Sequence, residues 1–340
     1  MENKEILENI KKNLTGKKEE DVSYLHSELR KYQMENNFNV AFGIQLLLFN
    51  YLTEEEKEKL NQGANAMLQD HKNKYEKAKE LLNYGDIEKA KKIFIELFDS
   101  YEKVGVLEGA NFYDFPEPIE LFLYLPKLRN IKIKRLPEPV VYYAYQIASI
   151  YLEQEDIYNA IVYLEKALLF NPICQYILQE LVDRLMMISE YERAYEHLKV
   201  SLKYAYTKNQ LAYCYKKLGQ YFKINQKYDL SIASYALSNL YIEDTENKIK
   251  IKEIVDIVGP IHFSSSDEII NLFKSVDLNY GPSKEVLATL KEYTKISKER
   301  KDYKTLKYIL NIAISLTNQD YFKNELESLK KGVKWQRMKK

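Results

Sequence analysis

Apolar residues recur along most of the chain at spacings of three and four, which is the pattern of amphipathic α-helices. Between Glu19 and Glu35, for example, Val22, Leu25, Leu29 and Tyr32 fall on one helical stripe. Short polar turns separate segments of this kind from the N-terminal region to the C-terminal region. The sequence therefore predicts an all-α fold.

In addition to the helical period, the sequence has a longer repeat of 34 residues. If Val141 is counted as place 1 of a 34-residue repeat, small residues stand at places 8 and 20, where two helices can then cross closely. Proline at place 32 ends the second helix. The residues at places 4, 7, 8, 11, 20, 24, 27 and 32 are Ala144, Ile147, Ala148, Tyr151, Ala160, Leu164, Ala167 and Pro172.

Three more repeats have the same spacing and start at His71, Gln175 and Ala212. The repeat from His71 has Gly85 at the turn between its two helices, where glycine readily adopts a positive φ. The repeat from Ala212 begins three residues late, and we expect the extra residues to lengthen the turn near 206–209. Repeats of this length predict paired helices that stack on one another.

This spacing resembles that of the tetratricopeptide repeat (TPR) family, whose pattern places W, L, G, Y, A, F, A and P at the same eight places. The resemblance implies a TPR-type α-α superhelix, that is, a solenoid of helix pairs. The run Tyr142-Tyr143-Ala144-Tyr145 after a Pro- and Tyr-rich insertion also resembles uncharacterised bacterial TPR proteins, and that likeness implies no established activity.

Residues 71–245 form the predicted repeat region, interrupted by an irregular insertion at 105–140 that contains five of the eight prolines. We expect this insertion to be partly helical, with a short apolar helix at 119–125, and to act as a lid, a bend or a binding element. Residues 1–70 are predicted to be an N-terminal helical cap or degenerate repeat. Within them, Thr53 and Glu56 form a capping box before a longer helix. Residues 246–340 are predicted to be a C-terminal helical cap.

The chain has 51 basic and 50 acidic residues, so it carries no overall charge that would attract nucleic acid or an anionic membrane. The longest apolar run, from Ile44 to Phe49, is too short to span a bilayer. Cys174 and Cys214 stand in apolar helical patterns, which is typical of buried thiols in a reducing compartment. The charged start has no secretory h-region. We therefore expect a cytoplasmic protein that binds neither nucleic acid nor membranes.

Motifs for catalysis are absent from the sequence. There is no phosphate-binding glycine loop, no HExxH and no spacing typical of a nucleophile. The four histidines are widely scattered, which argues against a metal site. We therefore predict no enzyme activity, no cofactor and no metal.

Tyrosine is abundant, with 30 residues, and it suits both helix seams and recognition surfaces. In TPR stacks the first helix of each repeat lines a concave groove through places 2, 5, 9 and 12–13. Carried over to this chain, the resemblance implies a peptide-binding groove. Its residues would be Tyr75, Lys79, Tyr142, Tyr145, Gln179, Asp183, Tyr213, Lys216, Gln220 and Lys223. The alternative is that these tyrosines simply pack against the next repeat.

Aromatic anchors beside polar groups favour recognition of an extended or helical segment. We therefore predict a TPR scaffold or adaptor that binds a protein or peptide segment in this groove. A second hypothesis is a peptide-sensing regulatory protein whose N-terminal helices are the effector region. The carboxylate clamp of some TPR proteins is not predicted, because Tyr75 and Tyr145 occupy place 5 and the asparagines of the clamp are missing.

Overall fold

The computed structural model describes residues 2–35, 37–105, 112–128, 134–317 and 319–338. The chain divides into two compact units. Unit 1 comprises Met1–Asp114 and Asn130–Phe170, and unit 2 comprises Phe115–Arg129 and Asn171–Lys340. Unit 2 thus consists of one long continuous stretch and one short segment that comes from the predicted insertion.

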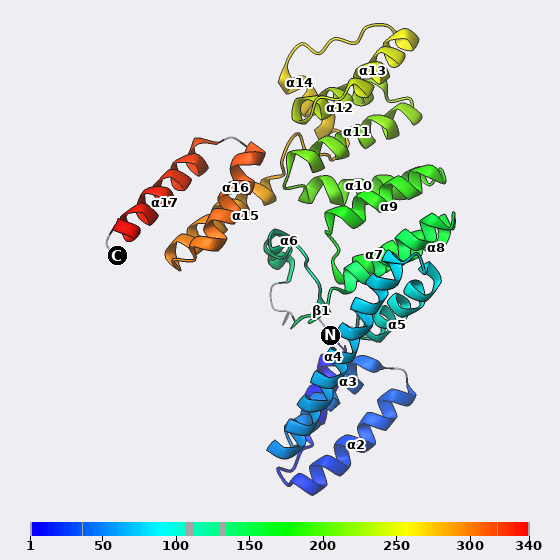
Figure 1. Cartoon of the computed structure of the whole chain (residues 1–340), viewed down its shortest axis with the longest axis vertical. Helices are drawn as coiled ribbons and strands as arrows, with labels where there is room; N and C mark the ends of the chain where they lie inside the picture. Colours follow the sequence, from blue (N-terminus) through cyan, green and yellow to red (C-terminus); the bar gives the residue numbers. More distant parts are fainter. Residues whose placement is uncertain (1, 36, 106–111, 129–133, 318, 339–340) are drawn as a thin grey trace. The chain divides into compact units, whose positions relative to one another are not determined.

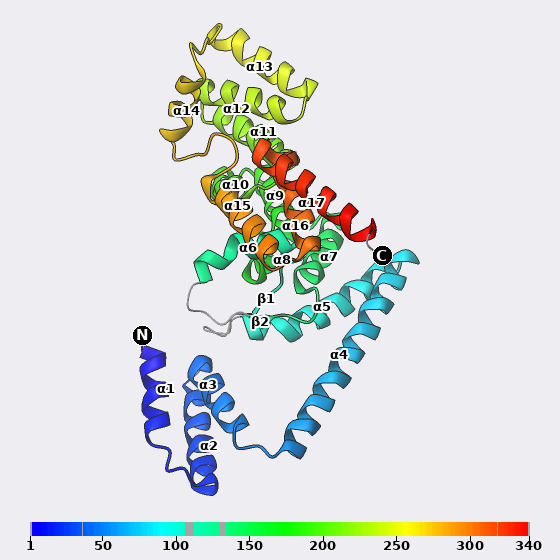
Figure 2. The ribbon, with the colours of Figure 1, turned by 90° about the vertical axis from the view of Figure 1, so that its left-hand side faces the viewer.

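Unit 1 contains a small N-terminal bundle and two helix pairs. The bundle has its own core, which includes Leu25, Val40 and Ile44. Helices α4 and α5 pack together, as do α7 and α8, and α5 also packs on α7. Figure 2 shows α4 as the long helix that the capping box at Thr53 predicted. The elements are α1 (Glu2–Lys12), α2 (Lys18–Met34), α3 (Phe38–Phe49), α4 (Glu54–Asn83), α5 (Ile87–Gly105), β1 (Phe112–Tyr113), β2 (Lys134–Arg135), α7 (Val140–Glu153) and α8 (Ile157–Phe170). The two short strands pair in parallel.

Unit 2 contains three helix pairs and several single helices. Helix α9 packs on α10, α11 on α12, and α15 on α16, while α13 packs on α12 (Figure 1). The elements are α6 (Pro118–Tyr124), the 3-10 helix η1 (Leu125–Leu128), α9 (Gln175–Met187), α10 (Tyr191–Tyr204), α11 (Lys208–Ile224), α12 (Tyr228–Tyr241), α13 (Thr245–Val258), α14 (Ser266–Lys274), α15 (Lys284–Glu299), α16 (Tyr303–Thr317) and α17 (Asp320–Met338).

The helices of each predicted repeat pack together at places 8 and 20, where every residue is small except Val182. Both residues are buried in all four repeats. In the repeat from Ala212 the crossing is so close that a Cβ atom on Gly219 would lie 2.8 Å from ring atoms of Tyr235. Ser231 at place 20 donates its hydroxyl hydrogen to the carbonyl oxygen of Gly219, at 2.6 Å. The all-α class and the TPR-type pairing of helices are therefore confirmed.

The turn between the paired helices is also repeated. The residue at place 15 has a positive φ, and the next N–H donates to the carbonyl oxygen of place 11, which is the Schellman arrangement. The φ values at place 15 are +78° at Gly85, 60° at Glu155, 64° at Ser189 and 57° at Gln226. The corresponding hydrogen bonds are Asp86 to Leu81 at 2.9 Å, Asp156 to Tyr151 at 2.8 Å, Glu190 to Leu185 at 2.9 Å and Lys227 to Phe222 at 2.9 Å.

A fifth pair with the same turn lies outside the repeats found in the sequence. Between α15 and α16, Lys301 has a φ of 57°, and the N–H of Asp302 donates to the carbonyl oxygen of Ser297 at 2.9 Å. Thr294 and Leu306 stand at the equivalents of places 8 and 20, and both are buried. The large leucine at place 20 departs from the small-residue rule, so the 34-residue pattern did not predict this helix pair.

The prediction of a longer turn near 206–209 was wrong. Helix α11 has 17 residues where α9 has 13, and α11 already begins at Lys208. The hydroxyl of Thr207 accepts a hydrogen bond from the N–H of Gln210, and the Gln210 side chain accepts one from the N–H of Thr207. This capping box lets the additional residues extend the helix instead of the turn.

The insertion is partly helical, as predicted, and its acidic residues cap two helices of the repeats. The residues that precede α7 and α9, Pro139 and Cys174, supply no side-chain cap. In unit 1 the Asp114 carboxylate accepts a hydrogen bond from the N–H of Val141 at 2.9 Å. In unit 2 the Glu120 carboxylate accepts one from the N–H of Gln175 at 3.1 Å. Both carboxylates are buried.

Candidate functional site

In unit 1 the predicted groove residues lie on α4 and α7, and all of them are half-buried. The ring of Tyr142 meets the ring of Tyr75 edge-on, with centroids 6.1 Å apart. The Nζ atom of Lys79 lies 5.1 Å from the centroid of Tyr75 and 3.1 Å from a carboxylate oxygen of Glu76. Burial raises the pKa of Tyr142. Tyr142 at place 2 of one repeat thus packs on Tyr75 at place 5 of the preceding one, and Tyr145 lies one turn further along α7.

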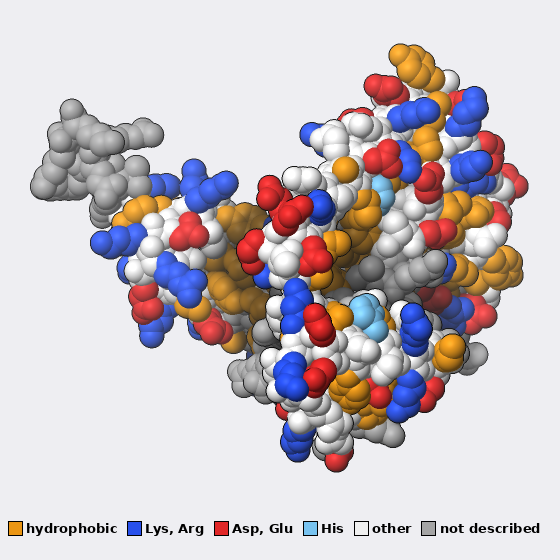
Figure 3. Space-filling model, turned by 90° about the horizontal axis from the view of Figure 1, so that it is seen from below, with side chains coloured by type: hydrophobic (Ala, Val, Ile, Leu, Met, Phe, Trp, Pro, Cys, Tyr) orange, Lys and Arg blue, Asp and Glu red, His pale blue; other side chains and the backbone are white. Residues whose placement is uncertain are grey.

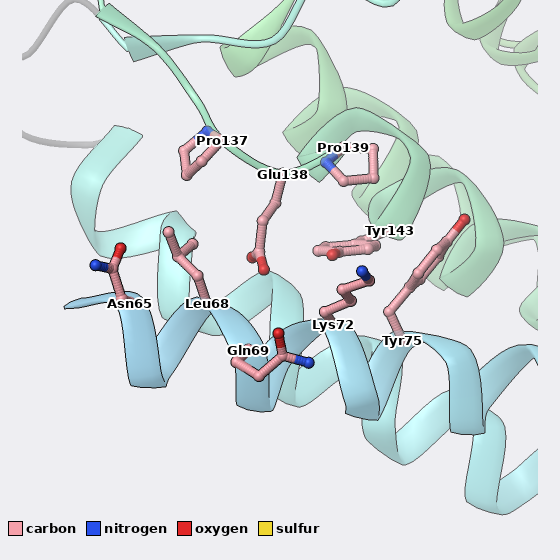
Figure 4. A pocket seen from close by; sticks show the side chains of 9 residues that line it. All are labelled: Asn65, Leu68, Gln69, Lys72, Tyr75, Pro137, Glu138, Pro139 and Tyr143. Atoms are coloured by element: carbon pink, nitrogen blue, oxygen red, sulfur yellow. The ribbon is translucent and has the colours of Figure 1, made fainter. Parts of the chain in front are cut away.

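Beside these tyrosines lies a pocket with a volume of about 480 Å³. Figure 4 shows the carboxylate of Glu138 pointing toward α4, with the ring of Tyr143 and the side chains of Lys72 and Tyr75 on one side of it. The lining residues are Asn65, Leu68, Gln69, Lys72 and Tyr75 from α4, Pro137, Glu138 and Pro139 from the segment before α7, and Tyr143 from α7.

The acidic group of this pocket is buried and has a partner, whereas its basic group is exposed. The side chain of Glu138 is only 8% exposed, and its carboxylate lies 3.0 Å from Nδ1 of His71. Burial and the adjacent Glu138 charge raise the pKa of Tyr101, which packs edge-on against His71. Lys72 is exposed, and it makes no ion pair within the part of the chain that the structure describes. The pocket therefore offers a cation beside aromatic rings.

The wall formed by Pro137, Glu138 and Pro139 was missed by the sequence reasoning. The groove residues were predicted from their repeat places, and this wall belongs to the insertion, which has no place number. A sequence signal does exist, because the Pro-Glu-Pro run immediately precedes the helix that carries Tyr142 and Tyr145. Asn65 and Gln69 also lie outside the repeat, in the part of α4 that precedes His71.

In unit 2 the corresponding residues form hydrogen bonds between consecutive repeats. The hydroxyl of Tyr213 lies 2.7 Å from the carbonyl oxygen of Gln179 and 2.8 Å from a carboxylate oxygen of Asp183. The same carboxylate lies 2.7 Å from Nζ of Lys217. Burial, together with the charge of Asp183, raises the pKa of Tyr213. Place 2 again contacts place 5 of the preceding repeat, as in unit 1, and here it also contacts place 9.

Two lysines of α11, Lys216 and Lys223, pair with acids of α13 and its N-cap. Nζ of Lys216 lies 2.8 Å from Asp244 and 2.6 Å from Glu246, and Nζ of Lys223 lies 2.6 Å from Glu253. Gln220 is exposed. The structure therefore brings Gln179, Asp183 and Tyr213 together and joins the two lysines to α13 and its N-cap. Figure 3 shows acidic and basic side chains interspersed on the face it displays, in keeping with the balanced composition.

Within the described ranges, no cluster of three or more His, Cys, Asp or Glu side chains could hold a metal ion. Of the helices in those ranges, none has both the length and the apolar character needed to cross a membrane.

No family model matches the chain, and no curated protein matches it. Among solved structures, the chain is similar to a tetratricopeptide repeat protein from Parabacteroides merdae ATCC 43184. The two are 14% identical, and the match covers 77% of this chain and 99% of that chain, with a TM-score of 0.32.

Proposed function

We propose that this chain is a binding protein that holds a segment of another protein on the face of unit 1 formed by α4, residues 137–139 and the start of α7. The observation that carries the proposal is the pocket beside Tyr75, which combines an aromatic ring with the cation of Lys72, a side chain that makes no ion pair among the described residues. Aromatic side chains are among the residues that dominate binding energy in protein interfaces. Concave pockets are typical of binding sites. The proposal assigns no catalytic step to the chain.

The lining indicates the chemistry of the bound segment. The half-buried ring of Tyr75 suits an aromatic or aliphatic side chain, and the amides of Asn65 and Gln69 suit its backbone. The ammonium group of Lys72 suits an aspartate or glutamate next to that side chain. The pocket is largely preformed, because Glu138 is held by His71 and lies between two prolines, so little ordering accompanies binding. An acidic-aromatic segment is therefore the proposed ligand.

The predicted residues of unit 2 have a different environment. A ligand that contacted Asp183 or Lys216 there would have to replace the inter-repeat hydrogen bonds and ion pairs these residues already make. Replacing such bonds brings little net gain, since the groups exchange one partner for another. A role for Gln179, Asp183, Tyr213, Lys216, Gln220 and Lys223 in binding stays a prediction, as do the cytoplasmic location and the role of residues 1–70 as an effector region.

The test is affinity capture with the full chain and with three variants. We expect Lys72→Glu to weaken capture of the partner about tenfold, since it reverses the charge facing the acidic side chain. Replacing Tyr142 and Tyr145 together with alanine should weaken it further. Lys77→Glu is the matched control, because Lys77 is an exposed lysine on the same helix outside the pocket lining.

Thermal melting of each variant separates a loss of binding from a loss of folding. The proposal fails if Lys72→Glu and Lys77→Glu retain the same partners in the same amounts. If a short free peptide carrying an aromatic and an acidic residue raises the melting temperature of the wild type but not of Lys72→Glu, the ligand chemistry is supported as well.

A further inference from the structure

Helix α6 is held in unit 2 as a separate short segment. The rest of the unit is the continuous stretch Asn171–Lys340, so α6 enters it from another part of the sequence. Ile119 and Leu123 of α6 are 0% and 4% exposed. The ring of Phe122 stacks on the ring of Tyr293 from α15, with centroids 4.0 Å apart and planes 14° apart. These contacts are of the kind by which a short amphipathic helix binds a groove.

The polar contacts of α6 centre on Glu120, which is 1% exposed. One carboxylate oxygen accepts from the side-chain amide of Asn171 at 2.7 Å, and the other accepts from the N–H of Gln175 at 3.1 Å. The hydroxyl of Tyr206 lies 3.4 Å from the second oxygen. Gln175 is the first residue of α9, where the helix dipole and unpaired N–H groups favour a carboxylate. Asn171 is itself fully buried, so these partners form a preformed binding site for one carboxyl group.

We propose that α6 is an internal ligand occupying a second peptide-binding surface, and that a partner segment of the same pattern competes for it. The pattern is that of residues 119–123: an apolar residue, glutamate, any residue, an aromatic residue and an apolar residue. The receiving surface consists of Asn171, the start of α9, Tyr206 and Tyr293. This inference does not depend on the binding face proposed for unit 1.

Proton uptake accompanies docking of α6. Burial raises the pKa of Glu120 to about 7, with a smaller contribution from the charge of Glu117, although Asn171, Gln175 and Tyr206 oppose the rise. Tyr308 of α16 completes the surroundings, since its hydroxyl donates to Glu117 at 3.2 Å. Because the pKa of the docked carboxyl group lies above the 4.5 of a free glutamate, docking is strongest at low pH and weakens as the pH rises through about 7.

The first experiment uses a fluorescent peptide with the sequence of residues 115–127 and the full chain. In the chain, Ile119→Ser with Phe122→Ala weakens the internal ligand and leaves the receiving surface unchanged. We expect this double variant to bind the peptide at least tenfold more tightly than the wild type, and added Tyr293→Ala to reverse that gain. A peptide with Glu120→Gln should bind without the loss of affinity that the wild-type peptide shows between about pH 4.5 and about pH 7. A double variant that keeps wild-type helicity but does not bind the peptide would overturn the proposal, as would binding insensitive to Tyr293→Ala.

The second experiment needs no destabilising change. Hydrogen exchange of the wild type should show residues 115–127 opening more readily than α9, because an internal ligand detaches without unfolding its surface. After correction for intrinsic exchange, this opening should increase between about pH 6 and about pH 8 in the wild type and stay constant in Glu120→Gln. If 115–127 exchange only together with α9, α6 is a permanent part of the unit and the proposal is wrong.

Discussion

The crossing of α11 and α12 at Gly219 gives a quantitative prediction about the repeats. A methyl group at this position would stand 2.8 Å from three ring atoms of Tyr235, against an ordinary contact of at least 3.4 Å. The ring of Tyr235 is 3% exposed, so it cannot move into solvent. Gly219→Ala therefore forces the two helices apart or pushes the ring against its buried neighbours.

Two opposing effects set the size of the change. Overpacking of a buried contact lowers the free energy of unfolding by about 1–3 kcal/mol. Replacing glycine with alanine inside a helix raises it by about 1 kcal/mol. We expect a net loss of about 1 kcal/mol for Gly219→Ala. Gly63→Ala is the matched control, because Gly63 also lies inside a helix but a Cβ there would have no atom within 4 Å. For Gly63→Ala we expect a gain of about 0.5–1 kcal/mol.

The assay is urea unfolding of wild type and both variants, followed by circular dichroism. The opposite signs of the two substitutions are the decisive result, because the change of side chain is identical and only the surroundings differ. If Gly219→Ala stabilises the protein as much as Gly63→Ala does, the helices do not cross as closely as described. The small-residue rule would then not explain the period of the sequence.

Two further predictions concern polar groups in each unit. Tyr213→Phe removes the hydroxyl shared by Gln179 and Asp183 and should lower the free energy of unfolding by about 1–2 kcal/mol in urea titrations; no change would mean that this contact between repeats is not formed in solution. Burial raises the pKa of Asp114 to about 6, from 3.8, so its contribution to stability is present at low pH and is lost as the pH rises through about 6. Asp114→Asn keeps an acceptor for the N–H of Val141 but cannot ionise. The urea midpoint of the variant should therefore exceed that of the wild type above about pH 7 and approach it near pH 4. A constant difference between the two midpoints at both pH values would contradict this.

The repeats could be read from the sequence because each depends on local chemistry. A helix pair with a close crossing needs small residues at places 8 and 20, and its turn needs a residue that tolerates positive φ. Gly85 and Gly219 show these requirements directly in the sequence. The pair α15–α16 has the same turn, at Lys301, but Leu306 replaces the small residue. A lysine at positive φ gives no sequence signal, so the pair became visible only in the structure.

The candidate sites were harder to predict than the repeats. Places 2, 5 and 9 do lie together, yet the same geometry lets Tyr213 bond to Asp183 and Tyr142 pack on Tyr75. Whether such a residue faces a ligand or the next repeat depends on what the adjacent helix presents. For Lys216 that neighbour is α13 with Asp244 as its N-cap, and no repeat pattern had indicated that α13 would supply acids there.

The sequence by itself determined the helical class, the repeat length and the residues at the crossings, because these follow from contacts within about 34 positions of the chain. Only the tertiary structure decided the role of the insertion. Asp114 and Glu120 become caps for α7 and α9 because the chain folds back onto helix ends that have no cap of their own. Contacts between segments with no common period are fixed by burial and by the need to satisfy polar groups across the whole unit, and a pattern along the chain does not record them.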